Sequence, residues 1–419
     1  MTPTRRILAL AKSSVAYGLI GVGAGLLSAA FLVALDFVTS FREGHPSLIW
    51  FLPVGGLAIG WVYQNHALGS DRGTNFILDE IHEPKSSIPF RMIPLVLLGT
   101  LVTHLFGGSA GREGTAVQMG GALSERICKG AGSPLVDRKL ALMAGMSAGF
   151  ASVFGTPIAG SLFGLEVLVI GGWRKFQFGH LAACTLAAFV GHWTVLALGV
   201  HHTSYHRPLA LALTIHSVIF TLTAGFLFGL LARLFAMISH AYASIAAKLF
   251  PSLPIRALVG GALVSSLILM FQLDRAVGLG LSVIKEALVQ PVALTDFATK
   301  FGLTILTLGS GFKGGEVTPL FYIGATFGNA LSEIIELPVS TLAALGFVSV
   351  FAGAANVPLA STLMAVEIFG SHIFPLATLS CLASTFASGH RGIYSSQKLI
   401  AMKSFESVLH SVYSRLRRR

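Results

Sequence analysis

Residues 107–115 read Gly107-Gly108-Ser109-Ala110-Gly111-Arg112-Glu113-Gly114-Thr115, a glycine-rich, charged break between two apolar runs at 93–106 and 116–123. Hydrocarbon offers no partner for freed backbone groups, so a break at membrane depth is expected only inside protein or beside a wet cavity. There the first N–H groups of the next helix form an anion site, which the helix dipole strengthens. A charged Glu113 competes with an anion for this site, and a protonated Glu113 either vacates it or donates a hydrogen bond to the anion.

The composition places this break in a membrane protein. The chain has 419 residues, of which 53% are hydrophobic and 11% charged, and its mean hydropathy is +0.76. These values predict an all-α polytopic membrane protein. Many of its apolar runs are shorter than the roughly 20 residues that a full span needs. The 47 glycines fit close helix packing and interrupted helices.

The formal net charge of +11 is scattered through short loops, which excludes nucleic acid as a partner and favours membrane topology and attraction of a small anion. Basic residues at both ends, Arg5, Arg6 and the run 415–419, predict cytoplasmic termini and an even number of crossings in the cell inner membrane. The cysteines show neither a disulfide framework nor metal-ligand spacing, and we expect no metal and no cofactor. They are Cys128, Cys184 and Cys381.

The chain falls into two similar halves. A polar loop at 201–208 separates residues 1–200 from residues 209–419. The motif at 111–115 aligns with Gly314-Gly315-Glu316-Val317-Thr318 in the second half. Repeated halves with interrupted helices point to a transporter whose site lies at the repeat interface near the membrane midplane.

A second match follows in the same order, since Pro157, Ala159, Leu162 and Glu166 align with Pro358, Ala360, Leu363 and Glu367. The symmetric placement of Glu166 and Glu367 favours a structural role, in which they cap backbone groups freed by the helix breaks. An odd number of spans per half would require the two halves to be inverted.

Gly111-Arg112-Glu113-Gly114 resembles the gating-glutamate motif of the CLC chloride channel and transporter family. The family's other two anion-site loops have counterparts at 69–75 and 314–319, its late anion-coordinating tyrosine resembles Tyr394, and 147–167 is also CLC-like. The resemblance covers nearly the whole chain. It implies one transmembrane domain over 1–419, a CLC-type fold of two inverted repeats with short, broken intramembrane helices, and a homodimer with one pore per subunit.

Several residues differ from those of the chloride members, and the differences indicate one branch of the family. Thr115 stands where they have Pro, Gly315-Glu316-Val317-Thr318-Pro319 replaces Gly-x-Phe-x-Pro, and Gly73-Thr74-Asn75-Phe76 replaces the serine loop. Val167 stands where chloride/proton exchangers have an internal proton glutamate. This combination resembles the bacterial fluoride/proton antiporters, and implies export of cytoplasmic fluoride by the inward proton gradient, gated by Glu113. The alternative is a CLC-type exchanger or passive channel for chloride or another anion.

The side chains agree with a fluoride site, because fluoride is small, tightly hydrated and a strong hydrogen-bond acceptor. Hydroxyl, amide, helix-start N–H and protonated carboxyl groups are compact donors that can replace its water. The expected anion-contacting residues are Thr74, Asn75, Phe76, Glu113, Thr115, Glu316, Thr318 and Tyr394.

Several roles stay open at this stage. Either Thr74 or Asn75 supplies the ligand of the first loop, and Phe76 either presents its positive ring edge to the anion or packs. Glu316 either faces the pathway with Thr318 or pairs with Lys313. Tyr394 either coordinates the anion or lies at the membrane interface, and Arg112 is either an anion ligand or a packing charge. His201, His202 and His206 either form a metal site or lie in a solvent loop.

Two other classes of function explain less. An intramembrane enzyme using Glu113 and Glu316 as an acid–base pair lacks a nucleophile constellation and a metal motif, so we do not expect an enzyme. A passive scaffold would not need two matched helix breaks that carry glutamates.

Overall fold

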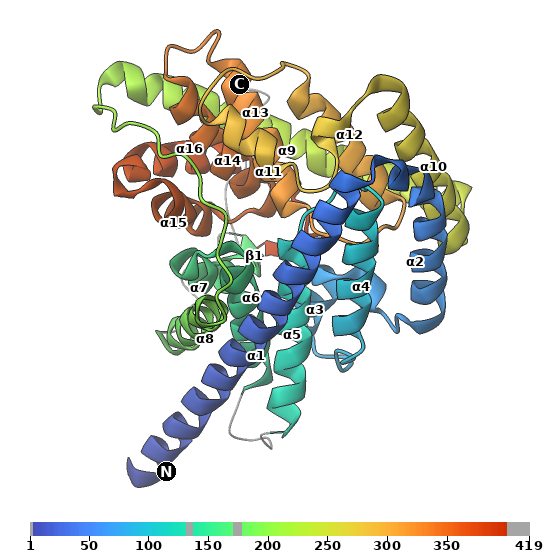
Figure 1. Ribbon diagram of the computed structural model, residues 1–419. Coiled ribbons are helices and arrows are strands. Elements are labelled where there is room, and N and C mark those ends of the chain that lie inside the picture. The colour runs from blue at the N-terminus through green and yellow to red at the C-terminus, as the bar shows by residue number, and fades with distance from the viewer. Residues whose placement is uncertain (1–2, 131–136, 171–177, 400–419) are drawn as a thin grey trace, which may run out of the picture.

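The computed structural model describes residues 3–130, 137–170 and 178–399, and is almost entirely helical (Figure 1). The basic run at 415–419 lies outside the described residues. The elements of the first half are α1 (Pro3–Gly44), η1 (Pro46–Phe51), α2 (Leu52–His66), η2 (Ser70–Arg72), α3 (Thr74–His82), α4 (Met92–Leu105), α5 (Glu113–Gly130), α6 (Arg138–Phe154), α7 (Pro157–Glu166), β1 (Val169–Ile170) and α8 (Phe178–Ala197). Those of the second half are α9 (Ile215–Leu249), α10 (Leu253–Phe271), η4 (Asp274–Ala276), α11 (Leu281–Ala287), α12 (Asp296–Gly309), α13 (Val317–Leu331), α14 (Val339–Ala355), α15 (Pro358–Phe369), η5 (Ser371–Ile373), α16 (Phe374–Ser388) and β2 (Lys398–Leu399).

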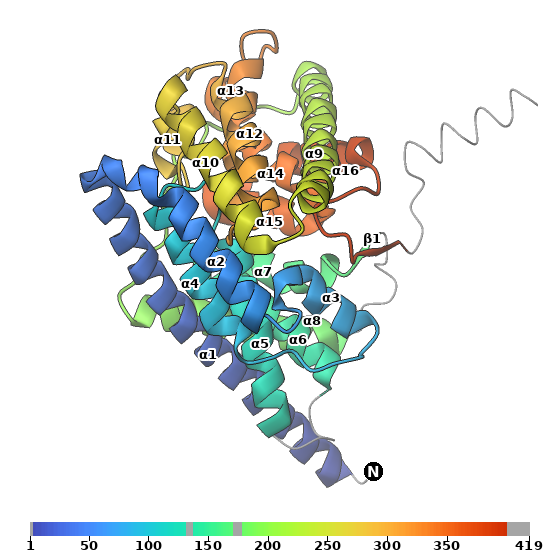
Figure 2. The same cartoon turned by 90° about the vertical axis from the view of Figure 1, so that its right-hand side faces the viewer.

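The all-α polytopic class is confirmed. Among the described residues, five helical stretches are long and apolar enough to cross a membrane: 12–44, 46–66, α8, α9 and α10. The apolar helices α4, α14 and α15 are shorter, as the short apolar runs of the sequence predicted. The helix order α1–α8 recurs as α9–α16, and α2 packs against α10 across the two halves (Figure 2).

The connection between the halves is longer than the sequence indicated. We expected the apolar pattern to resume at 209, but α9 begins only at Ile215, so residues 198–214 lie outside α8 and α9. A capping box sets this start, because the Thr214 side chain accepts from the Ser217 N–H and the Ser217 hydroxyl accepts from the Thr214 N–H.

Glycines allow the helices that follow the two breaks to pack at backbone contact. A Cβ added at Gly120 in α5 would lie 2.1 Å from the carbonyl oxygen of Gly145 in α6. In the second half a Cβ at Gly324 in α13 would lie 2.1 Å from the oxygen of Gly346 in α14. Both pairs of helices therefore depend on small residues, as the high glycine content predicted.

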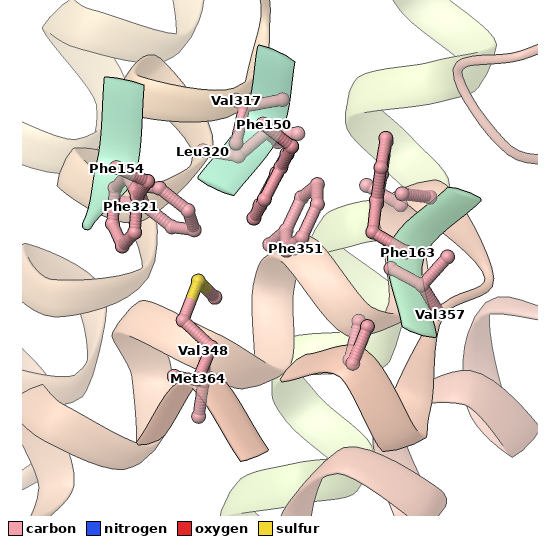
Figure 3. Packing of buried hydrophobic residues seen from close by; sticks show 14 of the residues in the cluster. Phe150, Phe154, Phe163, Val317, Leu320, Phe321, Val348, Phe351, Val357 and Met364 are labelled. Carbon is pink, nitrogen blue, oxygen red and sulfur yellow. The ribbon is translucent and has the colours of Figure 1, made fainter. Parts of the chain in front are cut away.

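An aromatic core joins the two halves (Figure 3). Phe150 of α6 and Phe351 of α14 hold equivalent places in the repeat, and their rings stack with centroids 6.2 Å apart. Phe163 of α7 lies 4.4 Å from Phe150, centroid to centroid. All three side chains are buried, so the largest apolar cluster lies at the repeat interface and fixes how the halves meet.

Candidate functional site

The two glycine-rich loops meet in an antiparallel bridge. The Gly111 N–H donates to the Gly315 oxygen at 2.6 Å, and the Gly315 N–H donates to the Gly111 oxygen at 2.8 Å. A Cβ on Gly111 would lie 2.8 Å from the Gly315 oxygen, so the approach requires glycine. The bridge satisfies backbone groups that the breaks free, and it brings the first residues of α5 and α13 together.

Glu113, the first residue of α5, reaches across this bridge to α13. Its Oε2 accepts from the Thr318 N–H at 3.1 Å, from the Thr318 hydroxyl at 2.5 Å and from the Arg112 N–H at 3.3 Å. The Thr318 N–H belongs to the first turn of α13, where a helix leaves its N–H groups without internal partners. A carboxylate oxygen thus occupies donors of the kind that bind anions at helix starts.

The second carboxylate oxygen of Glu113 has a different environment. Oε1 lies 3.7 Å from Arg112 Nε, and the structure gives it no hydrogen-bond partner. Nη2 of Arg112 donates to the hydroxyl of Thr203, in the connection between the halves, at 3.3 Å. The Glu113 side chain is fully buried, so Oε1 is held near a positive charge without a bond that would fix it.

A cavity of about 150 Å³ lies beside this arrangement. It is lined by polar groups from α3, α5, the loop before α13 and the segment after α16. The expected site residues among them are Thr74, Asn75, Glu316 and Tyr394. Asn75 Oδ1 accepts from the Ser396 N–H at 3.1 Å, which leaves the donor end of this amide for a ligand. Thr74 and Asn75 both line the cavity, so the choice between them stays open.

Glu316 and Lys313 both line the cavity but do not form an ion pair in the described chain. Lys313 Nζ instead lies 4.0 Å from the ring centroid of Tyr63 in α2. Of the two alternatives for Glu316, the position facing the cavity is therefore the one found. Thr318 is buried outside the cavity lining, where its donors hold Glu113.

Two expected site residues lie elsewhere. The hydroxyl of Thr115 lies 2.7 Å from the hydroxyl of Thr100 in α4, so Thr115 joins two helices and does not line the cavity. Phe76 is also outside the lining, where it is buried with its ring under Gly69 and 6.0 Å from the guanidinium carbon of Arg72. These neighbours are compatible with packing, and contact of the Phe76 ring edge with the anion stays a prediction.

Gln118 is a lining residue that our sequence analysis missed. It is the one amide in the apolar run 116–123, and this isolated polar side chain is the sequence feature that could have identified it as a lining residue. The histidines of the connection show no metal cluster: in the described parts of the chain, no three His, Cys, Asp or Glu side chains are grouped to hold an ion. His202 instead stacks on His192 of α8, with ring centroids 5.3 Å apart.

A buried carboxylate held by paired helix starts, next to a donor-lined cavity in a polytopic bundle, defines a membrane anion channel or transporter. A family model for voltage gated chloride channels matches residues 55–388. A chloride/fluoride channel protein of Pseudomonas syringae pv. tomato is 48% identical over 398 residues, which cover 93% of this chain and 87% of the relative. The chain therefore belongs to the CLC family of chloride channels and transporters.

Solved structures agree with this membership. The crystal structure of a CLC-type fluoride/proton antiporter matches with a TM-score of 0.89 and 37% identity, over 93% of this chain and 98% of that one. A slow cyanobacterial Cl−/H+ antiporter matches with a TM-score of 0.77 at 18% identity, which is a likeness of fold alone.

Proposed function

We propose that this protein is a fluoride/proton antiporter of the cell inner membrane, which exports cytoplasmic fluoride by using the inward proton gradient. The observation that carries the proposal is the pair of Thr318 donors on one oxygen of Glu113. A compact hydroxyl and a helix-start N–H suit a small anion that must exchange its water for strong donors. Two relatives, at 48% and 37% identity, bear names that include fluoride.

Coupling follows from competition for these donors. A charged Glu113 and a fluoride ion cannot both hold the Thr318 N–H and hydroxyl, because each needs the same hydrogens. A protonated carboxyl is a weaker acceptor than a carboxylate, so protonation of Glu113 releases the donors to fluoride. Fluoride then occupies the site while Glu113 carries a proton, and deprotonation reverses the exchange.

One titratable side chain is enough for this cycle. Val167, at the place where chloride/proton exchangers carry a second glutamate, is fully buried in the largest apolar cluster. Valine has no titratable group, so this position supplies no proton carrier. We infer that Glu113 alone carries the coupled proton, in each subunit of a homodimer within the lipid bilayer.

The second candidate is a chloride exchanger or a passive anion channel, and the chloride/fluoride channel name of the Pseudomonas relative favours keeping it. Efflux from proteoliposomes holding equal fluoride and chloride separates the two, with electrodes for both anions and for external pH. We expect fast fluoride loss, little chloride loss and matching proton uptake. Comparable chloride loss would assign the protein to chloride, and anion loss without proton movement would make it a channel.

Glu113→Gln tests the gating role in the same assay. This variant should lose proton uptake, because an amide cannot take part in the protonation cycle, while the protein still folds. The matched control is Glu333→Gln, which changes an exposed glutamate outside the cavity lining. Coupled proton uptake that persists in Glu113→Gln would remove Glu113 from the role.

A further inference from the structure

We propose that Lys313 is the counter-charge that holds the transported anion in the cavity before the anion reaches the Thr318 donors. This inference rests on the proposed function and names a binding residue of the same pathway. Lys313 belongs to the loop that precedes α13, three residues before Glu316, and its side chain lines the cavity.

The ammonium group of Lys313 is held by an aromatic ring and not by a carboxylate. Its Nζ lies 4.0 Å from the ring centroid of Tyr63, and the described chain has no ion pair that includes it. An ammonium removed from bulk water needs compensation, and the face of an aromatic ring supplies only part of it. The Asp71 carboxylate acts on this cation from beyond salt-bridge distance, so an anion that enters the cavity can come closer to the ammonium group than the described carboxylates do.

Neighbouring helices are shaped around this lysine. A Cβ added at Gly99 of α4 would lie 2.9 Å from both Cβ and Cγ of Lys313, so glycine leaves the space that the lysine stem occupies. Tyr63 is itself buried in α2, which fixes the ring beneath the ammonium group. Three separate elements thus position one positive charge in the cavity wall.

The other charges of the cavity wall do not supply this attraction. Arg72 is bonded to Asp79, so its charge is already neutralised. Asp71 and Glu316 are the carboxylates of the lining, and both repel an anion while they are ionised. Of the two cations in the described lining, Lys313 is therefore the one without a salt bridge, and the Asp71 carboxylate of the same lining acts on it only from beyond salt-bridge distance.

A fixed cation of this kind acts by Coulomb attraction. It raises the occupancy of the cavity by anions, and added salt weakens its effect by screening. It leaves the proton cycle unchanged, because Lys313 makes no contact with Glu113 or Thr318. The expected signature is a change in the half-saturating fluoride concentration that depends on ionic strength, at a constant ratio of fluoride to protons.

Lys313→Met and Lys313→Arg in the full chain test the assignment. Initial fluoride flux from proteoliposomes is measured against fluoride concentration, at low and high ionic strength. We expect Lys313→Met to raise the half-saturating concentration about 10-fold at low ionic strength, and much less at high. Lys313→Arg should restore most of the loss. Lys85→Met is the matched control, since Lys85 is exposed, lies 3.5 Å from Glu83 and does not line the cavity.

A pair of substitutions at Tyr63 gives a test that leaves Lys313 in place. Tyr63→Phe keeps the ring face, whereas Tyr63→Leu removes it, so only the leucine should shift the half-saturating concentration in the direction of Lys313→Met. Equal concentrations and equal salt dependence in wild type, Lys313→Met and Tyr63→Leu would overturn the assignment. If the proposed function is wrong, a different result is expected, because the wild type itself would then not exchange fluoride for protons.

Discussion

Glu166 and Glu367 cap each other's helices. Glu367 caps α7, which ends at Glu166, and Glu166 caps α15, in which Glu367 lies near the end. Glu367 in α15 accepts from the N–H groups of Ile158 and Ala159 at 2.9 and 2.8 Å, at the start of α7. Glu166, the last residue of α7, accepts from Leu359 and Ala360 at 3.0 and 2.8 Å, at the start of α15. The capping interpretation is confirmed, and the exchange ties the two halves together.

Removal of either cap should therefore loosen the whole subunit. Glu166→Ala or Glu367→Ala leaves two helix-start N–H groups without acceptors, which costs about 1–3 kcal/mol. We expect each variant to lose its monodisperse peak in detergent at a lower temperature than wild type. Exposed Glu333→Ala should not shift this temperature.

The same variants separate structural from functional roles. Protein that survives reconstitution should keep the wild-type ratio of fluoride to protons, since neither carboxylate lies in the cavity lining. A changed ratio in Glu166→Ala would show that this carboxylate takes part in proton movement.

The internal repeat and the cost of polar groups in a membrane interior made Glu113 and the capping pair predictable from the sequence. Gly-rich breaks with a glutamate are costly in hydrocarbon, which identified Glu113, and matched prolines identified the capping pair Glu166 and Glu367. The orientation of side chains on α5 could not be predicted, because residues 113–122 are all buried and give no amphipathic period. The contact of the Thr115 hydroxyl with Thr100 of α4 was therefore not foreseen, and contact of Thr115 with the anion stays a prediction.

The glycine contacts between α5 and α6 and between α13 and α14 should tolerate no added methyl group. Gly120→Ala and Gly324→Ala each place a Cβ against a backbone oxygen, so the helices must separate. Overpacking of this kind costs about 1–3 kcal/mol. Loss of stability in a detergent melting assay would confirm it.

Gly302→Ala is the control for this pair. A Cβ at Gly302 in α12 has no atom within 4 Å, so only the gain in helix propensity, about 0.5–1 kcal/mol, remains. Equal stability of Gly120→Ala and Gly302→Ala would contradict the close packing of α5 on α6.

Thr115→Val tests whether Thr115 serves packing or transport. The variant keeps the shape but loses the hydrogen bond to Thr100, which should lower stability by about 1 kcal/mol. The half-saturating fluoride concentration should stay at its wild-type value. A severalfold change in that concentration would return Thr115 to the anion site.

Thr318→Val addresses the donor pair on Glu113. The substitution keeps the backbone N–H and removes the hydroxyl, whose hydrogen bond to a charged group or anion contributes about 1.5–3 kcal/mol. We expect the half-saturating fluoride concentration to rise by roughly 10- to 100-fold. Thr318→Ser retains a hydroxyl and should lie much closer to wild type. If valine and serine behaved alike, the hydroxyl would not be a fluoride donor, and the helix-start N–H groups of α13 would have to bind the anion without it.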